Sequence, residues 1–377
     1  MRIYLDYQAT TPLDPAVREA MEPYWSDSFG NPHSEHRHGW QAAAGLDKAR
    51  QDIAALVGAD AEWTVFTSGA TEANNLALKG VMEAAPAGRR RLVTLATEHS
   101  CVLESARALE LRGYDLSVLP VQRNGIVDLG LLEETLGDDV ALVSIMAVNN
   151  EIGVIQPMAE IGALARNCGA LVHSDAAQAF GKVALDVQAM SLDLVSISAH
   201  KIYGPKGVGG LLVRPGTPVA TQMHGGGQEG GGLRSGTLAP ALIAGLGKAA
   251  QIAAARMDAD RAHAENLWQL MLENLPAPHL INGDLERRWH GNLNISFPGV
   301  DGARLLADLR RVSVSSGAAC ASAAGRHSHV LNALGVPRDQ AKASLRIGWG
   351  RFTTEEETEK AAEMISEAVA AQRRMAA

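Results

Sequence analysis

One lysine of the sequence stands where a side-chain amine could become a nucleophile. Lys201 follows the apolar stretch 192–198 and precedes a turn through Pro205. A lysine at the end of a buried strand can lose solvation, which lowers its pKa and frees the amine to form a Schiff base with a carbonyl. A solvated lysine in the turn is the alternative interpretation, and Lys206 is a weaker candidate for the same role.

A carboxylate and an imidazole also stand at predicted strand ends. Asp175 comes directly after the apolar stretch 170–174, and His99 lies where the stretch 91–96 gives way to a helical pattern. A carboxylate there could face a protonated ring nitrogen, although an Asp can equally cap a following helix. An imidazole at such a junction could stack on a flat ring and move protons near neutral pH.

Two further segments are rich in small residues. Residues 68–72 lead from a strand into a helix whose free N–H groups and positive dipole end suit a phosphate, although an ordinary capped helix has the same pattern. Residues 315–325 surround one thiol, that of Cys320. Because little apolar bulk is available to bury it, we expect this thiol to be accessible and reactive, and a tightly packed turn is the alternative.

In chain order, these features describe the parts of one pocket. A phosphate-binding turn, a ring-stacking His, a carboxylate and a Schiff-base lysine together predict a site for pyridoxal 5′-phosphate (PLP). The turn at residues 68–72 has neither a Walker pattern nor the GxGxxG pattern, so nucleotide binding is not favoured there.

The elements that must position these residues alternate along the first two thirds of the chain. Short apolar runs separated by helical patterns predict βαβ units and a mostly parallel sheet that is covered on both faces. Strands are expected at residues 64–67, 91–96, 116–120, 141–148, 170–174, 192–198 and 209–213. Helices are expected at residues 34–57, 71–85, 101–112, 129–136 and 158–168.

The pattern changes near residue 240, which predicts a second region. We therefore expect an α/β protein with a large domain over residues 15–255 and a smaller α+β domain made of residues 1–14 and 256–377. Two helices at 240–255 and 258–275, strands at 292–297 and 311–315, and helices near 302–309 and 354–376 are expected in this part.

Composition and charge exclude several classes of protein. The chain has 377 residues, of which 46% are hydrophobic and 20% charged, as in globular proteins with a large core. Its net charge of −8 argues against general binding to nucleic acid, and no stretch approaches the ~18 apolar residues of a membrane span. Cys101, Cys168 and Cys320 form no CxxC pair, which favours a reducing, cytoplasmic compartment.

The sequence resembles the cysteine desulfurases that supply sulfur for iron–sulfur clusters and thiolated nucleosides, along nearly its whole length. The resemblance implies the PLP-dependent transferase fold of type I and a homodimer. The matching segments are residues 4–12, 29–32, 68–72, 97–99, 148–153, 175–178, 200–207, 234–237, 315–320, 346 and 350–354.

The resemblance implies a role for each matching residue. Lys201 corresponds to the Schiff-base lysine, Asp175 to the partner of the pyridinium nitrogen, His99 to the stacked imidazole and Cys320 to the nucleophile. Further matches are Gln178 with the group that binds the ring hydroxyl, and Ala70, Thr71, Asn150, Ser198 and His200 with cofactor contacts. Thr237 matches a phosphate contact from the neighbouring subunit, and Asn150 and Arg346 match the residues that hold the substrate carboxylate.

The activity implied by the resemblance is removal of sulfur from L-cysteine. Lys201 would take the Cα proton and Cys320 would attack the substrate sulfur, giving a persulfide and L-alanine. His99 is a candidate to take the substrate thiol proton. The sulfur would pass to an acceptor, either an iron–sulfur scaffold or a tRNA thiolation enzyme, and no direct nucleic-acid or membrane partner is expected.

Two alternative functions stay open. A selenocysteine lyase or another class V PLP enzyme would share the same pocket. An inactive docking or sulfur-carrier dimer is an alternative of another class, and the intact Lys201, Asp175, His99 and Arg346 argue against it.

The sequence departs from the family pattern in the cysteine loop, in residues 325–329 that follow it and in the glycine-rich segment 225–232. Ala318 and Ala321 replace a serine and a threonine near Cys320, and residues 225–232 lack an arginine and contain one extra residue, which bears on the reach of Thr237. No resident metal is expected. The spacing of Cys320, His327 and His329 could hold a metal transiently, but a solvated basic loop is the favoured interpretation.

Overall fold

The computed structural model describes residues 2–316 and 328–376. Its larger part is built on a seven-stranded sheet in the order β2-β8-β7-β6-β5-β3-β4. The central neighbours pair in parallel and β8 is antiparallel to both β2 and β7, so the predicted mostly parallel α/β sheet is confirmed. The strands are β2 (Thr64–Thr67), β3 (Arg91–Leu95), β4 (Asp115–Leu119), β5 (Val140–Ser144), β6 (Leu171–Asp175), β7 (Leu194–Ser198) and β8 (Gly209–Val213).

Helices cover both faces of this sheet, because successive side chains of a strand point to opposite faces. On one face, Leu92 and Leu142 pack in a cluster with α4 (Ala70–Ala84) and α5 (Ser100–Glu110). The next residues along the strands, Val93 and Val143, belong to the cluster on the other face. That cluster includes residues of α3 (Arg37–Ala55), α7 (Met158–Asn167) and α8 (Pro240–Asn274). The helices α1 (Pro15–Met21), α2 (Pro23–Ser26) and α6 (Leu129–Thr135) complete the larger part.

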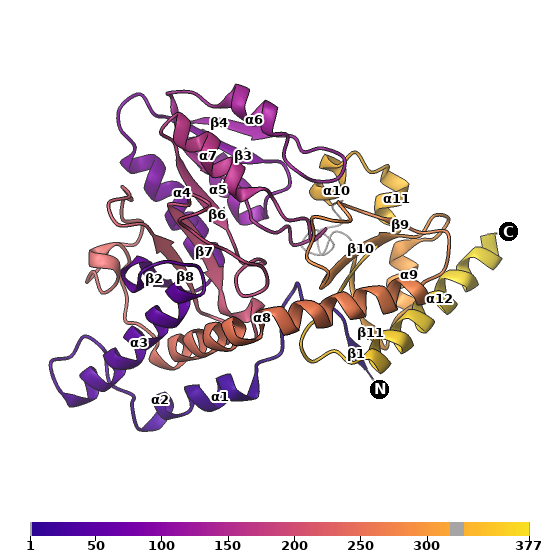
Figure 1. Ribbon diagram of the computed structural model, residues 1–377, viewed down its shortest axis with the longest axis horizontal. Helices are drawn as coiled ribbons and strands as arrows, with labels where there is room; N and C mark the ends of the chain where they lie inside the picture. The colour runs from indigo at the N-terminus through magenta and orange to yellow at the C-terminus, as the bar shows by residue number, and fades with distance from the viewer. Residues whose placement is uncertain (1, 317–327, 377) are drawn as a thin grey trace.

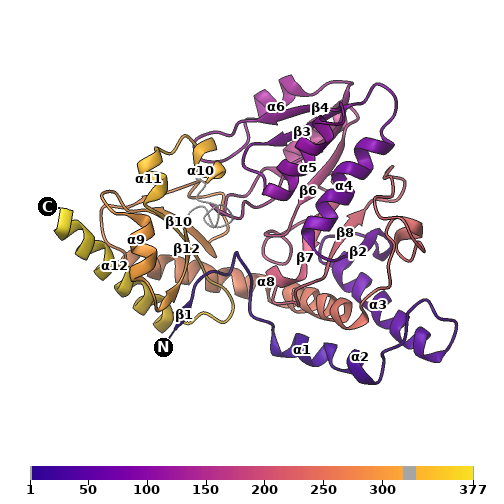
Figure 2. The same cartoon turned by 180° about the vertical axis from the view of Figure 1, so that it is seen from behind.

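One helix, α8, spans both parts of the molecule. The sequence predicts two helices here, but α8 is a single helix of 35 residues. The prediction of a break is wrong because no glycine or proline lies between residues 248 and 274, and Arg256 pairs with Asp260 one turn further on. Near its start, Gly247 lets α8 approach α3 closely, since a Cβ at Gly247 would lie 2.6 Å from the Cα of Ala49. Figures 1 and 2 both show α8 extending from the large sheet to the smaller part.

The smaller part contains an antiparallel sheet in the order β12-β13-β10-β9, with β1 and β11 paired in parallel beside it. Its strands are β1 (Ile3–Tyr4), β9 (Leu280–Ile281), β10 (Asn292–Ser296), β11 (Val312–Ser313), β12 (Ser315–Ser316) and β13 (Ser344–Gly348). Its helices are α9 (Gly302–Asp308), α10 (His329–Ala333), α11 (Arg338–Lys342) and α12 (Glu355–Ala376). We keep the division into 15–255 and 1–14 plus 256–377 as a proposal, which the pairing of β1 with β11 supports.

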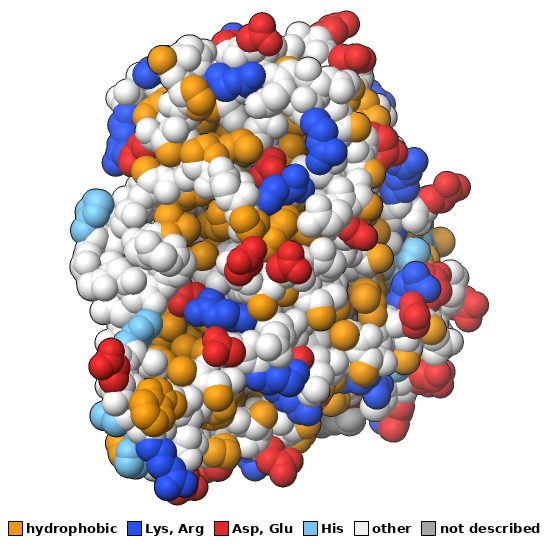
Figure 3. Space-filling view, turned by 60° about the vertical axis from the view of Figure 1, so that its left-hand side comes forward, with side chains coloured by type: hydrophobic (Ala, Val, Ile, Leu, Met, Phe, Trp, Pro, Cys, Tyr) orange, Lys and Arg blue, Asp and Glu red, His pale blue; other side chains and the backbone are white. Residues whose placement is uncertain are grey.

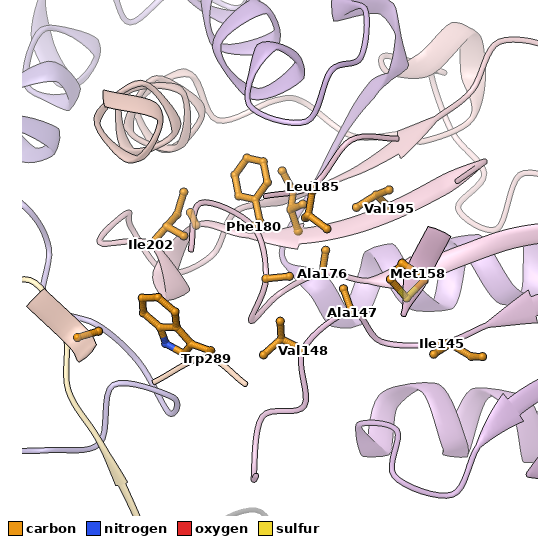
Figure 4. Packing of buried hydrophobic residues seen from close by; sticks show 14 of the residues in the cluster. Ile145, Ala147, Val148, Met158, Ala176, Phe180, Leu185, Val195, Ile202 and Trp289 are labelled. Atoms are coloured by element: carbon orange, nitrogen blue, oxygen red, sulfur yellow. The ribbon is translucent and has the colours of Figure 1, made fainter. Parts of the chain in front are cut away.

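The two parts share hydrophobic packing. Trp289, just before β10, lies near Val148, Ala176 and Ile202 of the larger part, and all four belong to one buried cluster (Figure 4). Burial of a large side chain at this junction stabilises one arrangement of the two parts, because each buried aromatic contributes a large apolar area. In the described ranges, no helix has the length and apolar character needed to cross a membrane.

A buried ion pair fixes the glycine-rich segment 225–232 to the large sheet. The carboxylate of Glu229 accepts two hydrogen bonds from the Arg50 guanidinium, at 2.7 Å each, and one from the Phe66 N–H at 2.8 Å. Glu229 is 1% exposed. The bidentate geometry and burial make this contact a structural anchor for the segment.

Removing one partner of this pair is expected to destabilise the protein. Arg50→Ala should lower the free energy of unfolding by about 3 kcal/mol, because the Glu229 carboxylate would stay buried without its counter-charge. The matched control is Lys48→Ala on the same helix, which loses only a surface pair with Asp52 and should cost less than about 1 kcal/mol. Urea unfolding at fixed protein concentration measures both, and equal losses would show that the pair is no anchor.

Candidate active site

A cavity of about 640 Å³ brings most of the predicted site residues together. It lies at the carboxyl ends of β2, β3, β5, β6 and β7, where loops meet the N-terminal segment and the β12–β13 pair. Ligands of open α/β sheets bind at this edge, because loops from neighbouring strands converge there. The predicted residues in its wall are Ala70, Thr71, His99, Asn150, Asp175, Gln178, Ser198, His200, Lys201 and Arg346.

One predicted residue that the structure describes is not in this wall. Thr237 is exposed and lines a separate cavity of about 70 Å³. Cys320 lies outside the described residues, as does His327.

One end of the cavity suits a phosphate. The helix α4 begins after Gly69, which has φ 152°, and within the described chain no side chain caps this helix end. β8 approaches the turn so closely that a Cβ at Gly209 would lie 2.7 Å from the Gly69 Cα. Burial, with smaller effects of Lys201, Lys206 and Lys182, lowers the pKa of His200 to about 4, and these lysines bring positive charge near this residue. Free N–H groups, a helix dipole and ammonium groups are the partners that an anion needs.

Asp175 presents a buried carboxylate at the end of β6. It is 4% exposed, its Oδ2 accepts a hydrogen bond from Asn74 Nδ2 at 2.7 Å, and its Oδ1 accepts one from the Ala177 N–H at 2.9 Å. No α-helix follows Asp175 directly, so capping of a helix does not explain its position. A buried carboxyl group that accepts two hydrogen bonds at the end of a strand can face a protonated ring nitrogen.

His99 lies beside Asp175 as a neutral ring. It is the residue before α5, and its Nδ1 accepts a hydrogen bond from the Cys101 N–H at 3.2 Å. Burial lowers the pKa of His99, Asp175 opposes this change, and Lys201 and His329 add to it. The ring is therefore neutral at pH 7, and because Nδ1 accepts a bond, the proton is on Nε2.

Lys201 ends the short 3-10 turn η2 (Ala199–Lys201) that follows β7. Its Nζ donates to the carbonyl oxygens of Gln8 at 2.6 Å and Ala9 at 2.8 Å. Gln178 reaches the same segment, since its Nε2 donates to Gln8 O at 2.9 Å. The N-terminal segment thus positions both residues. Sequence reasoning missed this role because backbone carbonyls make the contacts, although the match at residues 4–12 marked the segment.

Lys182 contributes a second ammonium next to the site. Its Nζ donates to Gln178 Oε1 at 2.8 Å. Burial, with a smaller effect of Lys201, lowers its pKa to about 7. In the unfolded chain a lysine titrates near 10.4, so between pH 7 and 10 the unfolded state binds more protons than the folded state.

Stability is therefore expected to rise with pH across this window because of Lys182. The slope from this one group approaches about 1.4 kcal/mol per pH unit. Lys182→Met should remove that contribution and stabilise the protein at pH 6–7, where the buried ammonium is charged. Urea unfolding at several pH values, compared between wild type and variant, measures the difference. If the free energy of unfolding changed with pH in the same way in wild type and in Lys182→Met, Lys182 would not be the titrating group.

The opposite end of the cavity contains a buried guanidinium. Arg346 on β13 is 2% exposed, and its Nη2 donates to Asp6 Oδ1 at 2.9 Å while its Nη1 donates to the Asn150 carbonyl at 3.2 Å. Within the described residues, Arg346 Nε and Asn150 Oδ1 are buried without a hydrogen-bond partner. Unsatisfied polar groups in a cavity wall indicate a ligand, and a guanidinium suits a carboxylate. Sequence analysis did not single out Asp6.

Comparisons with known proteins agree with this geometry. The model of the family Aminotransferase class-V matches residues 3–360. The chain belongs to this family. Its members are PLP-dependent enzymes, and the present cavity fits that cofactor through its uncapped helix end, its buried carboxylate and its lysine.

Several known proteins are similar to this chain over most of their length. This chain is 49% identical over 369 residues to a protein named cysteine desulfurase IscS of Rickettsia bellii. The match covers 96% of this chain and 90% of that protein. The IscS protein of Rickettsia felis is 48% identical with the same coverage. A solved structure of a NifS-like protein superposes with a TM-score of 0.92 at 36% identity, covering 98% of this chain and all of that one. A structure described as SspA in complex with cysteine has a TM-score of 0.84 at 34% identity, covering 94% and 100% of the two chains.

Proposed function

We propose that this chain is a cysteine desulfurase, which takes sulfur from L-cysteine and releases L-alanine. The observation that carries the proposal is the buried, partly unsatisfied Arg346 in the same cavity as Lys201 and Asp175. A carboxylate-binding group and a Schiff-base lysine in one cavity suit an α-amino acid substrate. The names of the relatives support cysteine as that amino acid.

The proposed role of each residue follows from its position in the cavity. The α4 end with Ala70 and Thr71, together with Ser198 and His200, would hold the phosphate, and Asp175 and Gln178 would hold the ring. When bound, PLP would supply an electron sink for the electrons released at the substrate Cα. Lys201 would hold and move the Cα proton, while Arg346 and Asn150 orient the substrate carboxylate.

Cys320 supplies the sulfur acceptor in this proposal. Its thiolate forms an S–S bond with the substrate sulfur as the Cβ–S bond breaks. The electron pair of the broken bond stays with carbon, which takes up protons to become the methyl group of alanine. The resulting Cys320 persulfide would pass its sulfur to an iron–sulfur scaffold or a tRNA thiolation enzyme, and the IscS names of the relatives support such a donor role.

The products released from L-cysteine test this function. With a reductant present, wild type should release alanine and sulfide in equal amounts, and Cys320→Ala should lose both. Cys168→Ala is the matched control, because Cys168 follows α7 and does not line the cavity. Turnover that survives Cys320→Ala would instead indicate direct lyase or transaminase chemistry, and a strong preference for L-selenocysteine would indicate a selenocysteine lyase.

We also infer a homodimer. Trp25, Phe29 and Trp40 lie between the start of α2 and the first turn of α3 and are each 64% exposed, and exposed aromatic side chains are enriched at protein interfaces. Figure 3 shows hydrophobic side chains exposed among interspersed acidic and basic ones on the face that it presents. The exposure of Thr237 outside this chain's main cavity supports its proposed role as a contact from a neighbouring subunit. Sedimentation equilibrium measures the mass, and a monomer would contradict the inference.

A cytoplasmic location stays a prediction.

A further inference from the structure

A chain of hydrogen bonds connects Asp175 to His99 through Cys101, which lines the cavity with them, and through Asn74, which does not. Asn74, on α4, is fully buried, and its Nδ2 donates to Asp175 Oδ2 at 2.7 Å and to Cys101 Sγ at 3.1 Å. Cys101 Sγ in turn lies 3.0 Å from His99 Nδ1. The four side chains come from α4, from β6 and from the start of α5, so three separate elements meet in one continuous network.

The direction of each bond in this network follows from the groups involved. An ionised carboxylate only accepts and an amide N–H only donates, so Asn74 donates to both of its partners. His99 Nδ1 already accepts the Cys101 N–H, so it carries no proton and must also be the acceptor toward the Cys101 sulfur. The Cys101 S–H is therefore the donor. Its protonated state agrees with its environment, since burial, with Asp175 and Glu98 adding to it, raises the pKa of the Cys101 thiol to about 12.

We propose that Asn74 and Cys101 are positioning residues, which hold His99 as the Nε2–H tautomer and connect its ring to Asp175. His99 then meets the reacting atoms as an N–H donor at Nε2. This differs from the expectation that His99 takes the substrate thiol proton, because the proton would have to enter at Nδ1, where two donors already point. The catalytic consequence rests on the proposed function, whereas the tautomer does not.

The charges around His99 set the expected pH dependence. Asp175 on β6 favours the protonated ring, while Lys201 on η2 and His329 on α10 disfavour it. The Cys101 S–H also favours the neutral ring, because it donates to the Nδ1 lone pair. Protonation at Nδ1 would break both hydrogen bonds to that atom and release the ring, so the acid limb of the pH–rate profile should follow the pKa of His99. Removing the Cys101 donor should raise that pKa and move the limb to higher pH.

The tautomer can be measured directly on ¹⁵N-histidine-labelled protein. Long-range ¹H–¹⁵N spectra distinguish the two ring nitrogens, and His99→Asn identifies the His99 signals by their absence. The expected result in wild type is a neutral ring protonated at Nε2, both with and without PLP. A ring protonated at Nδ1 would overturn the proposal without any variant, so the test does not depend on the folding of a mutant.

Variants of Cys101 test the positioning role. Cys101→Ala should lower kcat about three- to tenfold, the range for one lost hydrogen bond, with KM changed less than about twofold. Cys101→Ala should also move the acid limb of the pH–rate profile to higher pH. Cys101→Ser should restore both kcat and the position of this limb, because a hydroxyl donates to Nδ1 as the thiol does. Cys168→Ala is the control for loss of a cysteine elsewhere. An unchanged limb and kcat in Cys101→Ala would overturn the role.

The two proposals can fail separately. If turnover of L-cysteine survives Cys320→Ala, the proposed function fails while the His99 tautomer measured by NMR still stands. If the products behave as expected but the wild-type ring carries its proton on Nδ1, only the present inference fails.

Discussion

Lys201→Ala is expected to lower turnover of L-cysteine by about 10³-fold or more while the protein stays folded. The amine of Lys201 lines the cavity with Asp175 and His99, so in the proposed mechanism its removal takes away both the Schiff-base nucleophile and the base for the Cα proton. Its Nζ also donates to the carbonyl oxygens of Gln8 and Ala9, and losing these two hydrogen bonds should cost about 1–3 kcal/mol of stability. Initial rates of alanine release, with borohydride trapping of the cofactor, measure the loss.

Lys206→Ala is the matched control for Lys201. Lys206 lines the same cavity but is exposed and follows Pro205 in the turn. It should keep borohydride trapping and lose no more than about tenfold in rate, since it contributes only charge at the phosphate end. Lys201→Arg separates charge from nucleophilicity, because it keeps a cation near the Gln8 and Ala9 carbonyls. Trapping that persists in Lys201→Ala and disappears in Lys206→Ala would reverse the assignment.

Arg346→Ala is expected to raise KM for L-cysteine by about 100-fold or more, with a smaller loss in kcat. Charge-assisted hydrogen bonds contribute roughly 1.5–3 kcal/mol each, and the guanidinium can offer two to a carboxylate. Arg346→Lys keeps a charge but not the planar pair of donors, so it should recover only part of the affinity. Steady-state kinetics over a wide range of L-cysteine measures both values.

Asp6→Asn tests the same guanidinium by removing the charge that competes with the substrate for it. Asp6 accepts a hydrogen bond from Arg346 at 2.9 Å, so it competes with a substrate carboxylate for the guanidinium. Neutralising it should leave KM unchanged or lower it. A KM that rises equally in Asp6→Asn and Arg346→Ala would mean that the pair maintains the fold of this region and does not bind substrate.

Much of the fold and of the site could be predicted because it depends on local pattern. β2 and β8 begin and end where their apolar runs do, and Asp175, Lys201 and His99 mark strand ends that a parallel sheet brings to one edge. The remaining contacts come from segments far apart in the chain. Asp6 meets Arg346 across 340 residues, and Asn74 meets Asp175 across 101, so no spacing rule could pair them. The break predicted inside α8 fails because a change of composition does not end a helix.

The uninterrupted helix α8 affects what the free energy of substrate binding can be used for. At 1.5 Å per residue a helix of this length extends about 52 Å, and helices bend gently over such distances unless proline or a similar defect intervenes. A hinge at residue 256 is therefore not available, and any rotation of the smaller part would have to carry the second half of α8 with it. We expect Arg346 and Lys201 to keep nearly the same separation whether the cavity is empty or filled. Substrate would then enter a preorganised cavity, and its binding free energy could go to orienting the reacting bonds.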